Sequence, residues 1–140
     1  MWFRRDIASA IESLEAQAVE LSQAEAREKL AVMERAFATP GAGPLWERLQ
    51  ESSALRDAEG WRKIAEFVSG SALLLVQDAQ GVCAFRFTCA ADLIRVLDHC
   101  PGFEFYVCDD EVKYVLAFNH HDMLVGAGSA LTWVQACGDR

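Results

Sequence analysis

Near the start of the chain, apolar side chains recur at helical spacing. They stand three and four residues apart over 3–21, which predicts one amphipathic helix there. Ser22 and Glu25 then form the pattern of a capping box, so a second helix is expected from there to the Pro/Gly-rich loop at 39–44. With almost no linker between them, the two helices are predicted to pair as an αα-hairpin.

The pattern changes from helical to extended farther along the chain. Residues 45–49 and 61–68 keep helical spacing, whereas 52–60 is polar and expected to be irregular. A continuous apolar run at 72–76 and a return run at 82–87, joined by a short polar loop, predict a β-hairpin.

One further helix and three further strands complete the predicted set. The helix is expected over 90–99. In the segment 103–118 two runs alternate with period two and are separated by an acidic turn, which predicts two paired strands. A third strand leads into Gly126 to Gly128, interpreted as a bend where chains approach closely, and a last short element over 129–137 is expected to pack back.

Helices lead and strands follow, so the fold class is predicted to be α+β. The expected order is four helices, two strands, a helix, three strands and a short final element. The sheet should be mainly antiparallel, with helices on one face. A single domain is expected over 1–140, with the helical hairpin and linker in 1–43 and the α+β core in 44–140.

Composition narrows the classes of partner. The chain has 140 residues, of which 52% are hydrophobic and 24% are charged, as in globular proteins. The net charge of −8 argues against nucleic acid and anionic membrane as partners, because both favour a basic surface. Five cysteines without a CxxC pair, and no apolar segment resembling a signal peptide or a membrane span, favour a cytoplasmic protein with reduced thiols. No cofactor is expected.

The acidic turn and its flanking strands are a candidate contact surface for a basic protein partner. Carboxylates would steer such a partner, and tyrosines would add aromatic anchors. The alternative is an ordinary solvated acidic surface. The residues expected to contact a partner are Glu104, Tyr106, Asp109, Asp110, Glu111 and Tyr114.

The densest group of reactive side chains is Asn119, His120, His121 and Asp122. We interpret it first as structural, with Asn and Asp side chains satisfying turn backbone. The alternatives are a metal site, acid–base catalysis with Asp122 orienting an imidazole, and direct contact with a partner. Adjacent strand residues point to opposite faces, so both imidazoles reach one ion only if the backbone turns between them. We therefore expect neither a metal ligand set nor a catalytic constellation.

A resemblance adds to these observations. Its residues are Phe105-Tyr106-Val107, the strand at 114–118, the Asn119–Asp122 cluster and Gly126-Ala127-Gly128. On these, the segment 61–128 resembles a bacterial domain family of unknown function, similar in layout to the small acidic SMI1/KNR4-like immunity proteins. The resemblance implies a cytoplasmic binding protein that neutralises a toxin, and not an enzyme.

Three functions therefore remain open. The first is an immunity protein that binds a basic toxin. The second is a small metal-dependent or acid–base enzyme built on His120, His121 and Asp122. The third is a homodimer formed through the N-terminal helices, where Trp2 and Phe3 are apolar enough to lie in an interface, although they could equally close the core.

Overall fold

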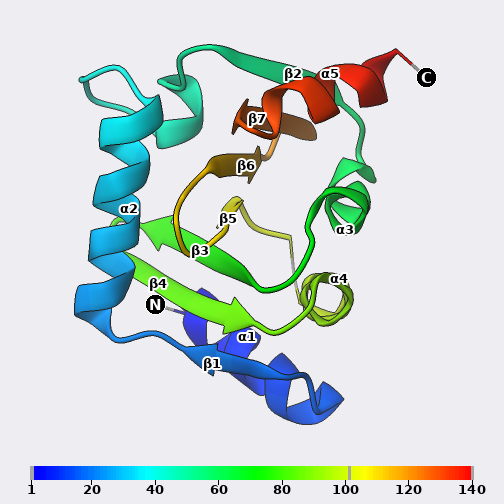
Figure 1. The fold of residues 1–140 in the computed structure, drawn as a ribbon. Coiled ribbons are helices and arrows are strands. Elements are labelled where there is room, and N and C mark those ends of the chain that lie inside the picture. The colour runs from blue at the N-terminus through cyan, green and yellow to red at the C-terminus, as the bar shows by residue number, and fades with distance from the viewer. Residues whose placement is uncertain (1, 101, 140) are drawn as a thin grey trace.

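Seven strands form one antiparallel sheet in the computed structural model, which describes residues 2–100 and 102–139 (Figure 1). Across the sheet the strands run in the order β1-β4-β3-β5-β6-β7-β2. In chain order they are β1 (Ala18–Glu20), β2 (Ser52–Arg56), β3 (Ala72–Asp78), β4 (Gly81–Phe87), β5 (Phe105–Cys108), β6 (Tyr114–Phe118) and β7 (Met123–Gly128). In the second half of the chain, most strands that lie side by side in the sheet also follow each other in sequence. Short hairpins therefore build the centre of the sheet.

The other elements are helices and single turns of 3₁₀ helix. They are α1 (Trp2–Leu14), α2 (Gln23–Phe37), η1 (Leu45–Glu47), η2 (Gly60–Lys63), α3 (Ile64–Phe67), α4 (Ala90–His99) and α5 (Leu131–Gly138). The fold is α+β, as the sequence predicted. No helix in the described ranges is both long and apolar enough to cross a membrane.

Both faces of the sheet are covered, which corrects the prediction that helices cover only one. In β3 the side chains of Leu74 and Val76 enter one core, and those of Leu73 and Leu75 enter another on the opposite face. All four are buried, because α2 and η1 pack over the second face while α1, α3, α4 and α5 pack over the first. Figure 1 shows α2 standing apart on its own side of the sheet.

The predicted αα-hairpin is wrong. Helix α1 ends at Leu14, and Glu15 follows with a left-handed φ of 53°. The chain then pairs β1 with β4 before α2 begins, so α1 and α2 lie on opposite faces of the sheet. The first 43 residues therefore contribute an edge strand and both cores, and they do not form a separate helical unit.

From the sequence, Trp2 and Phe3 are expected either to lie in a dimer interface or to close the intramolecular core. Phe3 packs inside the molecule, with its ring centroid 5.3 Å from that of Phe103, and it borders the first core. This agrees with the alternative in which it closes the intramolecular core. The side chain of Trp2 lies outside the part of the chain that the structure describes.

The polar segment 52–60, predicted to be irregular, contains β2, which pairs with β7 at the edge of the sheet. The helix predicted at 45–49 is the single 3₁₀ turn η1, and the one predicted at 61–68 is η2 followed by α3. The capping box was predicted correctly: Glu25 N donates to Ser22 Oγ, and Ser22 N donates to Glu25 Oε1, both at 3.1 Å.

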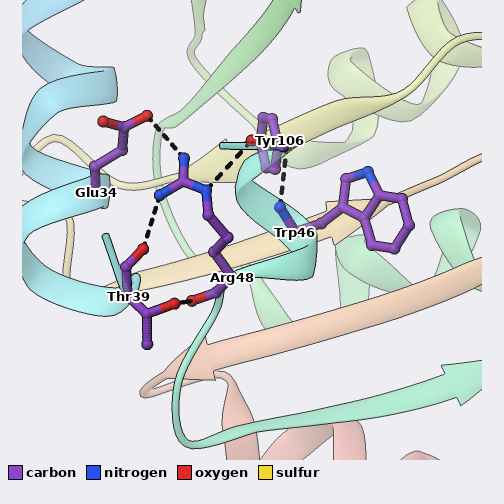
Figure 2. A network of polar contacts seen from close by, with 6 residues as sticks. Glu34, Thr39, Trp46, Arg48 and Tyr106 are labelled. Carbon is purple, nitrogen blue, oxygen red and sulfur yellow. Dashed lines mark hydrogen bonds and ion pairs between the residues drawn. The ribbon is translucent and has the colours of Figure 1, made fainter. Parts of the chain in front are cut away.

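Arg48 closes the loop between α2 and η1. Its guanidinium donates to the carbonyl oxygens of Thr39 at 2.9 Å and Gly43 at 3.2 Å, and to Glu34 Oε1 at 3.3 Å (Figure 2). In the same network, Trp46 N donates to the hydroxyl oxygen of Tyr106 at 3.3 Å, which ties η1 to β5. The loop is thus held against the second face of the sheet.

Candidate functional site

The residues predicted to contact a partner do not share one surface. Glu104 directly precedes β5, whereas Asp109, Asp110 and Glu111 follow it in the turn to β6. Four strand residues lie between Glu104 and Asp109, so the two are five residue steps apart, which corresponds to roughly 17 Å along an extended chain. The predicted acidic surface is therefore split between opposite ends of β5.

Two of the three carboxylates in the acidic turn pair with cationic side chains. The carboxylate of Asp110 pairs with Arg86, which holds the pKa of that carboxyl below its usual range. Asp109 Oδ1 accepts from Lys113 N at 2.7 Å, and Glu111 lies 3.5 Å from Lys113 Nζ. These contacts fix the turn and reduce the field that it presents to a partner.

The two tyrosines of the predicted surface lie in the core. Tyr106 is 5% exposed and Tyr114 is 6% exposed, and they pack on opposite faces of the sheet. Burial raises the pKa of Tyr106 to about 12 and also raises the pKa of Tyr114. Neither ring is available as an exposed anchor for a partner.

The structure instead joins Glu104 to the polar cluster. Glu104 Oε2 accepts from His120 N at 3.0 Å and also contacts His120 Nδ1. Burial acts to raise the pKa of Glu104, but the hydrogen bonds from the backbone N–H and the ring of His120 outweigh it and hold the pKa below its usual range. The carboxylate is therefore ionised at neutral pH.

The two histidine rings lie side by side because the backbone turns between them. Their centroids are 3.9 Å apart, and the ring of Trp46 meets both edge-on, at 6.2 Å from His120 and 5.9 Å from His121. The indole N–H of Trp46 is buried and forms no hydrogen bond with a described residue. Trp46 thus packs against the cluster from the side of the second face of the sheet.

The outer members of the cluster shape the turn between β6 and β7. Asn119 is 3% exposed, and its Oδ1 accepts from His121 N at 2.9 Å and Met123 N at 3.2 Å. Asp122 has a left-handed φ of 59°, and its carbonyl oxygen accepts from Asp57 N at 2.9 Å. For Asn119 this is the structural role that the sequence favoured.

The structure does not assemble a metal site from these side chains. Within residues 2–100 and 102–139, no group of three or more His, Cys, Asp or Glu side chains is placed to hold an ion. His120 is instead bonded to Glu104 through Nδ1.

An open pocket of about 500 Å³ borders the cluster on the first face of the sheet. Its walls come from η2, the end of α4, the segment before β5 and the turn after β6. Four aromatic residues and three acidic residues contribute to the lining. These are Trp61, Phe103, Phe105 and Phe118, and Asp98, Glu104 and Asp122.

Sequence reasoning did not find this pocket. In the sequence, Trp61 begins a segment with helical spacing, Asp98 lies in a predicted helix and Phe103 begins an alternating run, and none of these patterns indicates a pocket. These residues come together at the pocket only because elements distant in sequence pack against each other, as α3 does against α4. The local spacing of residues does not encode such contacts. The Glu104–His120 pair is likewise 16 residues apart.

The fold class and the site therefore describe an α+β protein with an acidic, aromatic pocket beside a His–Glu pair. Comparison of the chain with family models, curated proteins and solved structures gave no match.

Proposed function

We propose that this protein binds a partner protein with a basic surface, and that it acts as an immunity protein neutralising a toxin in the cytoplasm. The observation that carries the proposal is the pocket: aromatic walls bordered by Asp98, Glu104 and Asp122. Such a pocket suits an anchoring side chain that enters from a partner, because binding energy concentrates where aromatic and charged groups are shielded from water.

Charge and the resemblance to small acidic immunity proteins both support this function. A net charge of −8 would speed encounter with a basic partner and make the encounter rate depend on salt. Because the acidic turn is compensated by Arg86 and Lys113, the pocket end of β5 is the better candidate for the centre of the interface. The partner's active site would be occluded by contact with this end.

The test is affinity capture from the source cell's lysate with three tagged forms: wild type, Glu104→Gln at the pocket and Glu111→Gln at the turn. A basic protein that is toxic when expressed alone, and silenced by co-expression of the wild type, is the expected result. If this toxic protein is no longer captured by Glu104→Gln but is still captured by Glu111→Gln, the centre of the interface lies at the pocket. Absence of any toxic protein silenced by this chain would refute the immunity function.

A second candidate is acid–base catalysis by the same pair. The contact of Glu104 with His120 Nδ1 is the arrangement that orients an imidazole as a general base, with Glu104 taking the part that the sequence assigned to Asp122. The binding function ranks first because the side chain of His120 is 63% exposed and lies largely in solvent. Loss of a measured hydrolytic activity in His120→Gln, with unchanged partner capture, would favour the enzyme instead.

A further inference from the structure

Charge and shape of the pocket together define the chemistry of its occupant. Its volume of about 500 Å³ lies within the range of sites that bind small ligands or anchoring side chains. Phe105 and Phe118 form an apolar floor, with ring centroids 6.0 Å apart. An occupant must therefore be apolar along its body and must carry a group that compensates the carboxylates at the border.

Glu104 is the carboxylate best placed to receive such a group. Both hydrogen bonds from His120 go to Oε2, so Oε1 takes part in neither. The lowered pKa of Glu104 means that it carries a negative charge at neutral pH. Asp122 adds negative charge to the same lining, whereas the charge of Asp98 is compensated by Arg62, so a cation is favoured at the side of the pocket formed by Glu104 and Asp122.

The molecule contains its own example of the expected contact. The guanidinium of Arg62 lies over the ring of Trp61, with Cζ 4.4 Å from the centroid, and it pairs with Asp98. Trp61 and Asp98 both line the pocket. One edge of the pocket thus already binds a guanidinium through an aromatic face and a carboxylate together.

We propose that the pocket binds an arginine side chain of the partner, with the guanidinium on Glu104 and the methylene groups against the aromatic walls. This rests on the proposed function and names the partner chemistry of the same site. Arginine fits better than lysine, because a planar guanidinium stacks on aromatic rings and bonds a carboxylate through two donors, whereas an ammonium is a strongly hydrated point charge.

The test uses n-butylguanidinium as a probe, titrated into the ¹⁵N-labelled full chain and followed by NMR in about 0.1 M salt, which screens the general acidic surface. The probe should shift the His120 amide and the Trp61 indole signals and saturate with a Kd on the order of 1 mM, as expected for a ligand of this size. Neutral n-butylurea, which has a similar shape, should bind about tenfold more weakly.

Two variants complete the design. Glu104→Gln retains a side-chain acceptor for the His120 N–H but loses the charge, and it should weaken the probe about tenfold. Glu111→Gln changes the same charge at the other end of β5 and should leave the Kd within about twofold. Equal binding of butylurea and butylguanidinium to the wild type would overturn the proposal, as would undiminished binding to Glu104→Gln.

The test of the arginine site can fail independently of the test of the immunity function. A silenced toxin whose capture is insensitive to Glu104→Gln, with no probe binding, would refute the arginine site and leave the immunity function intact. Probe binding that depends on Glu104, without any toxic partner, would refute the immunity function and retain a guanidinium site.

Discussion

Gly126 offers the sharpest test of how β7 and α5 pack. A Cβ at this position would lie 2.6 Å from Val134 Cγ2 and 3.0 Å from the carbonyl oxygen of Ala130. The backbone φ of Gly126 is not in the left-handed region, so alanine would meet no backbone strain there. The substitution Gly126→Ala therefore isolates the close approach that the sequence suggested for Gly126 to Gly128.

The expected cost follows from these contacts. Carbon atoms pack best at about 3.5–4.0 Å, so the methyl of Val134 would have to move by about 1 Å. Val134 is fully buried and β-branched on a helix, which leaves it little rotamer freedom. Overpacking of this kind costs about 1–3 kcal/mol, while the loss of unfolded-chain entropy returns about 0.4–1 kcal/mol. We expect a net destabilisation of about 1–2 kcal/mol.

Urea unfolding followed by circular dichroism measures this effect. With m near 2 kcal/mol/M, the midpoint of Gly126→Ala should fall by about 0.5–1 M at unchanged m. Gly102→Ala is the matched control, because a Cβ there would meet no atom within 4 Å, and it should change stability by less than about 0.5 kcal/mol.

A double-mutant cycle identifies the clash itself. Val134→Ala alone should destabilise the protein by leaving a cavity, but it also makes room for the new methyl at position 126. The double variant should therefore be more stable, by about 1 kcal/mol, than the sum of the single effects predicts. Additivity within about 0.3 kcal/mol, or a midpoint for Gly126→Ala at or above that of the wild type, would refute the packing argument.

Three further outcomes are expected. Arg48→Ala should lower the free energy of unfolding by about 1–3 kcal/mol, because the Arg48 side chain is only 15% exposed and donates to two carbonyl oxygens. Arg35→Ala removes an exposed ion pair of 3.9 Å and should change the free energy of unfolding by less than about 0.5 kcal/mol. Equal effects of the two substitutions in urea unfolding would contradict this expectation. The hydrogen bond from Gln17 N, together with Arg95, lowers the pKa of Asp92, so the stabilisation that ionised Asp92 gives the fold is present above about pH 4 and is lost as pH falls through the lowered pKa. The stability difference between wild type and Asp92→Asn should therefore shrink in that pH range. A stability difference that does not depend on pH would argue against this role of Asp92. Iodoacetamide should modify exposed Cys89 first, because burial raises the pKa of Cys83 to about 11 and that of Cys108 to about 12; mass spectrometry showing Cys108 modified before unfolding would contradict the buried sheet.

Local signals in the sequence were enough to predict several elements. The capping box at Ser22 identified the start of α2, because its two hydrogen bonds join residues only three apart. The hairpin of β3 and β4 and the helix α4 were likewise predicted from apolar spacing and turn residues. Alternation at 103–118 predicted β5 and β6 correctly, since period two holds for any strand.

Where a residue's role depends on what packs against it from far along the chain, the sequence was insufficient. The spacing of Ala18 and Leu21 continued the helical pattern of α1, and no glycine marked the left-handed turn at Glu15, so β1 was missed. Edge strand β2 was missed because its sequence, Ser-Ser-Ala-Leu-Arg, does not alternate between apolar and polar residues. Tyr106 was placed outside because alternation gives the two faces of a strand but does not reveal that α2 covers the second.

The same distinction applies to the site. Composition determined an acidic protein, and the turn residues identified the Asn119–Asp122 cluster. Only the tertiary structure joined His120 to Glu104, separated the acidic turn from Glu104 and enclosed the pocket between η2, α4 and the strand ends. The physical reason is that charge and spacing are properties of single segments, whereas a pocket exists only between segments whose relative positions are set by packing of the whole core.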